Sequence, residues 1–282
     1  MRLFCFGYGY SAEGLVRKLS PRLASAAGTR TSLPDAAEPA LTLATYTGDG
    51  PSPEARRLLE GATHVLVSIP PDLEGDAALR HFADDLAALP DLAWIGYLST
   101  IGVYGDCKGA WVDETAPVRP ASERSLRRLQ AEQAWMAFGA ETGHRVDIYR
   151  LAGIYGPGRS VVDNLRKGTA RRIVKPGQVF NRIHVDDIAR VLAAAIETQT
   201  EHRIFNVSDD EPTPPQDVVA YAAELLGLPV PPAIPFAQAG LTGLAASFWG
   251  ESKRVRNGRI RGELGVDLVY PTYREGLRAL AG

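Results

Sequence analysis

The chain opens with MRLFCFGYGYSA over residues 1–12. The apolar run Arg2–Phe6 is typical of a buried strand, and a helical pattern begins at about Ser11. Between strand and helix, the first glycine of a Gly-x-Gly-x-x-Ala loop permits a tight turn and the second lets the backbone approach a pyrophosphate. A small third residue lets the helix pack closely on the strand. The opening therefore predicts a nicotinamide-dinucleotide-binding α/β protein, with the cofactor on Gly7, Tyr8, Gly9, Tyr10, Ser11 and Ala12.

The rest of the chain alternates short apolar runs with helical patterns. The clearest helix begins at Ile188, where apolar residues recur at i, i+3, i+4, i+7 and i+8, and we expect Asp186 or Asp187 to cap it. This alternation predicts a Rossmann, doubly wound parallel sheet. Further strands are expected at Leu41–Thr45, His64–Ile69, Leu92–Ser99, Val146–Leu151 and Ile204–Val207.

The last quarter of the chain has a different composition. Proline-rich stretches at Pro212–Pro215 and Pro229–Pro235 interrupt it, and the basic run Lys253–Arg261 lies close to its end. We interpret this quarter as a small C-terminal substrate lobe. The expected division is an NAD(P)-binding Rossmann domain over 1–155 and 181–208, and the substrate-binding lobe over 156–180 and 209–282.

Composition excludes several classes of protein. With 282 residues, 45% hydrophobic residues and a formal net charge of −2, the chain has no global positive field for nucleic acid or an anionic membrane. Its two cysteines, Cys5 and Cys107, suggest neither a disulfide framework nor a metal site. No apolar run is long enough for a membrane span or a secretory signal. We expect a cytoplasmic protein with a small-molecule substrate.

The end of the second strand usually selects the dinucleotide. An acidic residue there binds the ribose 2′-hydroxyl of NAD(H), whereas an arginine accommodates the 2′-phosphate of NADP(H). Here the region reads Gly28-Thr29-Arg30-Thr31-Ser32, and its nearest acid, Asp35, lies beyond Pro34. Arg30 with Thr29 or Ser32 therefore favours NADP(H); the alternative is that Arg30 is a solvated surface residue. The loop Ser68, Ile69 and Pro70 is expected to pass the adenosine ribose.

Several motifs later in the chain point to one family. Tyr97–Gly105 places a hydroxyl residue shortly before Val-Tyr-Gly, Arg150–Gly158 contains Tyr-Gly-Pro-Gly, Ile183–Ile188 reads Ile-His-Val-Asp-Asp-Ile, and Phe205–Val207 reads Phe-Asn-Val. Together these segments resemble the extended short-chain dehydrogenase/reductase superfamily, in its NAD-dependent epimerase/dehydratase group. The resemblance implies that Ala152 and Gly153 lie at the cofactor, and that the protein forms a homodimer.

One motif of that family is missing. Its members carry Tyr-x-x-x-Lys on the helix after the fifth strand, followed four residues later by a common Glu. With that Glu on Glu132, the Lys position is Arg128 and the Tyr position is Arg124. A guanidinium stays charged, so Arg124 cannot cycle a proton, although Arg128 can still hydrogen-bond the cofactor ribose. Two arginines suit an anionic ligand group; the alternative is a solvated helix face with Arg128 near Glu132.

The resemblance supplies other candidates for chemistry. Thr100 matches the residue that hydrogen-bonds the reacting oxygen. Tyr104 and His184 are candidate acid/base residues, and the alternative is a packing role for Tyr104 and a structural hydrogen bond for His184. Tyr155 falls in the segment beside the nicotinamide. The basic run resembles the element that contacts the anionic part of the substrate, or it is a solvated helix. The candidate substrate-binding residues are therefore Arg124, Tyr155, Lys253, Arg254 and Asn257.

Two functions follow from these observations. The first is an NADP(H)-binding oxidoreductase or epimerase-like enzyme that acts on a small anionic metabolite without the Tyr/Lys pair. The second is a catalytically inactive NAD(P)-binding sensor or scaffold. The retained Thr100, the Tyr155 segment and the full C-terminal lobe favour the enzyme. The missing acid/base pair favours the sensor.

Overall fold

The computed structural model describes residues 1–34, 41–198, 200 and 203–282. The chain divides into two compact units. Unit 1 comprises Met1–Thr100, Glu123–Arg150 and Ile188–Phe205. Unit 2 comprises Ile101–Ser122, Leu151–Asp187 and Asn206–Gly282.

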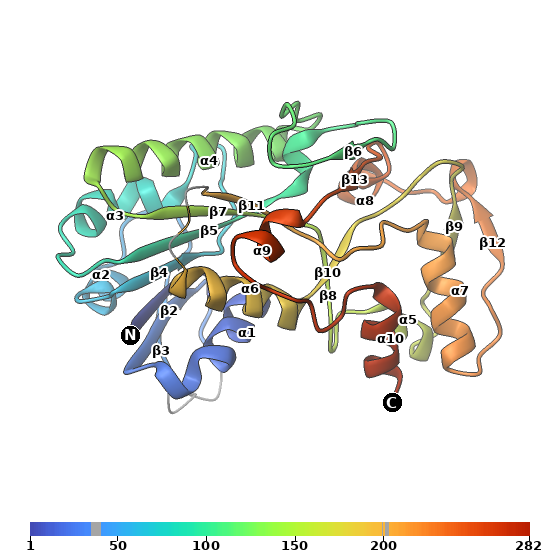
Figure 1. The fold of residues 1–282 in the computed structure, drawn as a ribbon, viewed down its shortest axis with the longest axis horizontal. Coiled ribbons are helices and arrows are strands. Elements are labelled where there is room, and N and C mark those ends of the chain that lie inside the picture. The colour runs from blue at the N-terminus through green and yellow to red at the C-terminus, as the bar shows by residue number, and fades with distance from the viewer. Residues whose placement is uncertain (35–40, 199, 201–202) are drawn as a thin grey trace. The chain divides into compact units, whose positions relative to one another are not determined.

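Unit 1 is built on a seven-stranded sheet with the order β11-β7-β5-β4-β1-β2-β3 (Figure 1). Strand β1 pairs in parallel with β2 on one side and with β4 on the other. The strand order therefore reverses between β1 and β4, which makes the carboxyl ends of these strands a topological switch point. The prediction of a Rossmann-like parallel sheet is confirmed. The strands are β1 (Arg2–Phe6), β2 (Ser25–Arg30), β3 (Leu41–Thr45), β4 (His64–Val67), β5 (Trp94–Thr100), β7 (Val146–Leu151) and β11 (Ile204–Val207).

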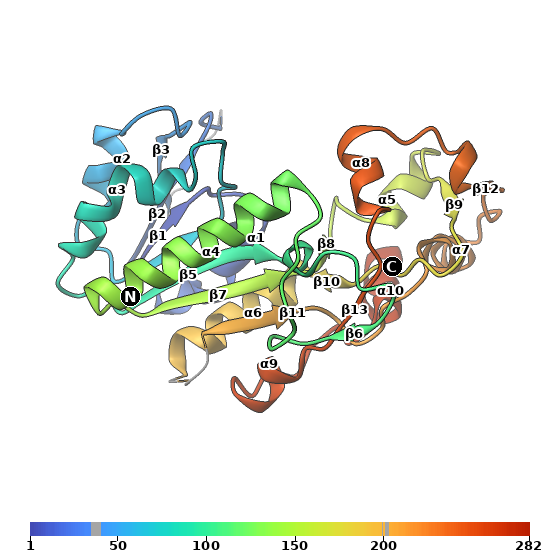
Figure 2. The same ribbon diagram turned by 90° about the horizontal axis from the view of Figure 1, so that it is seen from above.

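Helices cover both faces of this sheet. Helices α2 (Pro53–Leu59), α3 (Ala77–Ala87) and α4 (Glu123–Thr142) pack on one face, and α1 (Tyr10–Leu19) and α6 (Val185–Glu197) on the other (Figure 1). Figure 2 shows α4 running along the sheet beside β5. Asp76 begins α3 by accepting a hydrogen bond from the backbone N–H of Leu79, and Ser52 caps α2 in the same way.

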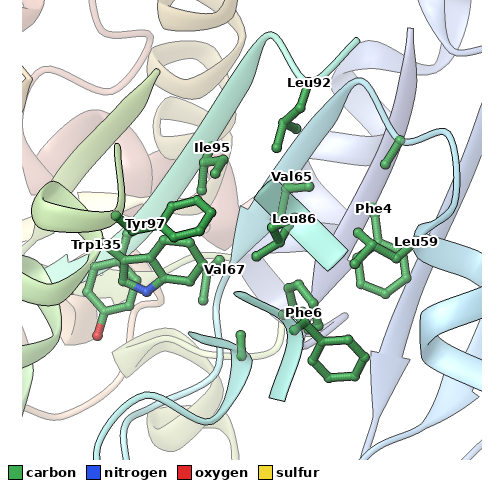
Figure 3. Packing of buried hydrophobic residues seen from close by; sticks show 14 of the residues in the cluster. Phe4, Phe6, Leu59, Val65, Val67, Leu86, Leu92, Ile95, Tyr97 and Trp135 are labelled. Carbon is green, nitrogen blue, oxygen red and sulfur yellow. The ribbon is translucent and has the colours of Figure 1, made fainter. Parts of the chain in front are cut away.

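The core on the α2–α3–α4 face follows from strand periodicity. Alternate residues of β1, Phe4 and Phe6, point into it and make an edge-to-face pair with ring centroids 4.8 Å apart. Leu59 of α2 and Leu86 of α3 belong to the same buried cluster, and Trp135 of α4 packs beside Tyr97 of β5 (Figure 3). Each fully buried side chain of this size stabilises the fold by about 1.5–3 kcal/mol.

The element boundaries show where sequence patterns are informative. Strands β1, β3, β7 and β11 have the predicted bounds, whereas β4 ends two residues earlier than expected. Helix α6 begins at Val185, so Asp186 and Asp187 lie within its first turn instead of preceding it. Asp187 accepts hydrogen bonds from the backbone N–H groups of Val269 and Tyr270, at 2.7 and 2.9 Å. Its carboxylate holds the C-terminal segment, a tertiary role that periodicity does not reveal.

Unit 2 contains three short pairs of parallel strands and a small helical cluster. The pairs are β8 (Gly153–Tyr155) with β10 (Arg182–His184), β9 (Arg172–Val174) with β12 (Ala233–Pro235), and β6 (Trp111–Val112) with β13 (Arg254–Val255). Capping boxes at Ser160 and Thr272 begin α5 and α10. The helices are α5 (Val161–Arg166), α7 (Pro215–Leu225), α8 (Gly243–Phe248), α9 (Gly258–Gly262) and α10 (Tyr273–Ala281), and α5, α7 and α10 share an apolar core.

Short 3₁₀ helices complete the chain at Ser20–Arg22, Ile101–Tyr104 and Phe236–Gln238. Among the residues that the structure describes, none of the helices combines the length and the apolar character that crossing a membrane requires.

Candidate functional site

Unit 1 has a cleft of about 590 Å³ where the segments after β1, β2, β3 and β4 meet. This is the carboxyl edge of the sheet, at the switch point where open α/β sheets bind ligands. Eight predicted cofactor residues line the cleft together: Gly7, Tyr8, Gly9, Thr29, Arg30, Ser68, Ile69 and Pro70. The cleft also has the size of a small-molecule site, for which 300–1,000 Å³ is the usual range.

The two loop glycines have different structural roles. Gly7 has φ +87°, and a Cβ there would lie 2.7 Å from Ile69 Cγ2. Only glycine fits this position without strain. Gly9 precedes α1 with extended backbone, and a Cβ on it would meet nothing within 4 Å. The backbone of Gly9 therefore borders open space, as a close approach by a pyrophosphate requires.

The loop is held by the end of β2. The backbone N–H of Gly7 donates to Thr29 Oγ1 at 3.0 Å, and that of Tyr8 donates to the Thr29 carbonyl at 2.7 Å. Thr29 is fully buried, so its hydroxyl supports the loop. Tyr10, Ser11 and Ala12 form the first turn of α1, with Ala12 fully buried. The N-terminus of a helix favours a bound anion.

Arg30 ends β2 and lines the cleft. Its Nη2 lies 3.1 Å from Glu13 Oε1, and its guanidinium carbon lies 5.9 Å from the centre of the Tyr8 ring. The side chains of Arg30 and Glu13 are 33% and 38% exposed. The sequence analysis did not identify Glu13. Its position in the first turn of α1, directly after the glycine loop, is the signal that could have placed it close to the end of β2.

Four residues that line the cleft were not among the predicted site residues: Thr31, Leu33, Pro34 and Tyr46. Tyr46 follows β3, and its hydroxyl donates to the Ala77 carbonyl at 2.8 Å. Burial raises the pKa of Tyr46 to about 12, so its hydroxyl stays neutral. Ser32 lines the cleft as expected of the β2 end, whereas Asp35 falls outside the described residues.

The candidates in unit 2 are mostly buried and hydrogen-bonded there. The Tyr104 hydroxyl donates to Asn206 Oδ1 at 2.7 Å, and His184 Nδ1 accepts from the backbone N–H of Asp186 at 3.2 Å. The rings of Tyr155 and His184 meet edge to face, 5.2 Å between centroids, and burial raises the pKa of Tyr155. Ala152 and Gly153 pair through their backbone N–H groups with Val207 and Asn181.

The basic run near the C-terminus is not the solvated helix that was one alternative. Arg254 lies in β13, and Asn257 precedes the five-residue helix α9. The Lys253 side chain is 6% exposed, and its Nζ lies 2.5 Å from Glu251 Oε2. Arg254 donates to the Gly109 carbonyl, and Asn257 donates to the Ser208 carbonyl at 2.7 Å. Each of the three therefore has an internal partner in unit 2.

The comparisons with known proteins agree with this geometry. Residues 91–208 match the NAD dependent epimerase/dehydratase family. Over these residues the chain resembles this family. A conserved protein of unknown function from Silicibacter pomeroyi DSS is 50% identical, with a TM-score of 0.89 over 99% of this chain and 97% of that one.

Two further relatives extend the comparison. Protein YeeZ of Escherichia coli (strain K12) is 30% identical over 178 residues, which are 62% of this chain and 58% of that protein. The chain therefore spans little more than half the length of this curated relative. The dTDP-glucose 4,6-dehydratase of Bacillus anthracis, solved in complex with NAD, is 16% identical with a TM-score of 0.79, over 100% of this chain and 95% of that one. At that identity the likeness is one of fold.

The helix that carries the acid/base pair in this epimerase/dehydratase family is α4. Arg124 is exposed at its start, whereas Arg128 is 9% exposed and its Nη1 donates to the Leu98 carbonyl at 2.7 Å and to the Tyr97 hydroxyl at 3.2 Å. The alternative of a solvated Arg128 beside Glu132 does not hold, because Arg128 is turned into the sheet.

Glu132 has partners of its own on the sheet side. Its carboxylate accepts from Ser99 Oγ at 2.5 Å and from Arg150 Nη2 at 2.8 Å, and both ion-pair side chains are about 5% exposed. Thr100 ends β5 directly after Ser99. The Glu used to align this helix is therefore a buried structural residue, and the Lys position beside it is an arginine with a carbonyl partner.

Proposed function

We propose that the cleft of unit 1 binds a nicotinamide dinucleotide, NADP(H) in preference to NAD(H). The observation that carries the proposal is the combination, in one cleft, of a Gly9 backbone bordering open space with an arginine at the end of β2. The pyrophosphate of a dinucleotide needs open space at the Gly9 backbone, and the arginine at the end of β2 suits a 2′-phosphate. The match of residues 91–208 to the epimerase/dehydratase family, and the NAD bound to the Bacillus anthracis dehydratase, support a nicotinamide dinucleotide as the ligand.

The cleft residues fit such a ligand segment by segment. Gly9 and the first turn of α1 would hold the pyrophosphate, while Ser68, Ile69 and Pro70 would pass the adenosine ribose. Arg30 and Ser32 would hold the 2′-phosphate. When bound, the dinucleotide supplies hydride donor and acceptor chemistry, and the chain's own residues position it.

We further propose an oxidoreductase or epimerase-like enzyme for a small anionic substrate. Arg124, exposed at the start of α4, suits an anionic group, and Thr100 suits the reacting oxygen. The proposal includes a cytoplasmic location, a homodimer, and no nucleic-acid or membrane partner. The net charge of −2 supports the last point.

One observation favours a second function, a sensor or scaffold that binds the dinucleotide without catalysis. Arg128 occupies the position of the family's lysine and binds the Leu98 carbonyl, and Arg124 cannot exchange a proton near neutral pH. Assays with small carboxylated substrates separate the two functions if they follow both NADPH consumption and epimerisation, because an epimerase returns the hydride and consumes no net NADPH. Turnover that Thr100→Val reduces supports the enzyme, and tight binding without turnover supports the sensor.

The cofactor proposal is tested by calorimetric titration of NADPH and NADH into the protein and two variants. Arg30→Ala should weaken NADPH binding by about tenfold or more, towards the NADH value, because a charged pair to a phosphate is lost. Arg57→Ala is the matched control, since Arg57 lies on α2 with a 71% exposed side chain and does not line the cleft. Equal affinities for NADPH in all three proteins would overturn the assignment of Arg30.

A further inference from the structure

We propose that Glu13 sets how strongly the cleft discriminates between NADP(H) and NAD(H), acting through Arg30. The inference rests on the proposed function, because it concerns the ligand of the same cleft. Glu13 is a positioning residue here. Its effect reaches the ligand through the guanidinium that it holds.

The geometry places a carboxylate beside the arginine that ends β2. Strand β2 ends without an acid of its own, since residues 28–32 are Gly, Thr, Arg, Thr and Ser. Glu13 reaches that position from α1 and lies 3.1 Å from Arg30 Nη2. Both side chains remain about one-third exposed, so the pair is open to a ligand. An acid supplied by the helix thus stands beside the arginine of the strand.

The two side chains have opposite preferences. A 2′-phosphate is attracted by the positive charge of Arg30, but the Glu13 carboxylate beside the guanidinium offsets part of that charge. A free 2′-hydroxyl carries no charge, so its binding depends less on the net charge of the Arg30 guanidinium. Arg30 therefore raises the NADP(H) preference and Glu13 lowers it.

The guanidinium can serve both partners at once. It has five N–H donors, and Glu13 occupies the Nη2 side. The Tyr8 ring, 5.9 Å from the guanidinium carbon, borders Arg30 on another side. Replacement of Glu13 by glutamine keeps a hydrogen-bond acceptor for Arg30 and removes the negative charge. This variant therefore isolates the charge from the position of the side chain.

The test is a double-mutant cycle on nucleotide affinity, with dissociation constants for NADPH and NADH measured by calorimetry on the full chain. Glu13→Gln should raise the ratio of NADH to NADPH dissociation constants by about tenfold, mostly by tightening NADPH. In an Arg30→Ala background the same change should alter that ratio by less than about twofold, because the residue acts through Arg30. Glu54→Gln, on the exposed α2 pair with Arg57, is the control and should leave the ratio unchanged.

Each other outcome has a defined meaning. If Glu13→Gln changes the dissociation constants for NADPH and NADH by the same factor, Glu13 has only a structural role and the inference is overturned. An equal change of the ratio with and without Arg30 would also overturn it, because Glu13 would then act directly. If the unmodified protein binds NADPH and NADH but the cycle fails, the proposed function stands without this inference. If it binds neither, both fail together.

Discussion

Alanine substitutions at the two loop glycines should affect different properties. Gly7→Ala should lower the stability of the protein, and Gly9→Ala should lower its affinity for the dinucleotide. At Gly7, alanine must adopt φ +87°, in the left-handed region, which costs an L-residue about 1–2 kcal/mol. Its Cβ would also lie 2.7 Å from Ile69 Cγ2 and 3.1 Å from the Ile69 nitrogen, an overlap that typically costs about 1–3 kcal/mol. The free energy of unfolding should therefore fall by about 2–5 kcal/mol.

At Gly9 the same substitution meets no obstacle in the protein. The backbone is extended at φ −125°, and a Cβ has nothing within 4 Å, so the loss of stability should not exceed about 1 kcal/mol, the usual difference between glycine and alanine at a helix N-cap. The added methyl group would instead occupy the space that a pyrophosphate needs. We expect dinucleotide affinity to fall by about tenfold or more, equivalent to at least about 1.4 kcal/mol.

Chemical denaturation and calorimetric titration of both variants separate these effects. Gly7→Ala should show the loss of stability, and Gly9→Ala should unfold close to the unmodified protein while binding NADPH weakly. Gly50→Ala is a control for the effect of an added methyl group on binding, because a Cβ at Gly50 has nothing within 4 Å and Gly50 does not line the cleft. Normal NADPH binding by Gly9→Ala would refute the pyrophosphate position.

Three further predictions concern stability. Burial lowers the pKa of His64 from 6.5 to about 4, with Arg145 adding to the effect, so the stability held by neutral His64 is complete above pH 6.5 and is lost as the pH falls towards 4. His64 is only partly buried, so solvent screening reduces the effect. The loss of stability from pH 7 to pH 5 should be about 1 kcal/mol larger in the unmodified protein than in His64→Gln, and an equal loss in both would contradict this origin. Glu132→Gln removes the buried carboxylate that pairs with Arg150, so it should cost about 3–5 kcal/mol in urea unfolding. A loss below about 1 kcal/mol would mean that the pair is solvated. Gly276→Ala would place a Cβ 2.1 Å from the Tyr155 hydroxyl oxygen and should lower the melting temperature, whereas Gly262→Ala, with nothing within 4 Å, should not; equal melting temperatures would show that Tyr155 moves freely.

Much of unit 1 was predictable because its signals are local. A strand, a glycine loop and a helix within residues 1–19 determine the switch-point geometry, and the apolar runs of β3, β7 and β11 have the predicted bounds. The eight predicted residues that meet in the cleft follow from one rule. The carboxyl ends of parallel strands share an edge, so loops that are distant in sequence converge there.

The features that could not be predicted from the sequence depend on tertiary contacts between side chains. The Glu13–Arg30 contact joins residues 17 positions apart, on a helix and a strand, and no periodicity encodes it. Arg128 and Lys253 belong to types that are usually exposed, yet each is buried because a local carbonyl or carboxylate pairs with it. The residue type predicts only the average environment of an arginine or lysine. The environment of a particular side chain becomes clear only from the folded structure.

The most direct test of the central claim is a crystal structure of the full chain grown with NADPH. The account predicts the pyrophosphate against the backbone of Gly9 and the first turn of α1, with the 2′-phosphate within hydrogen-bond distance of Arg30. A dinucleotide bound elsewhere, or a cleft that stays empty at saturating NADPH, would contradict it.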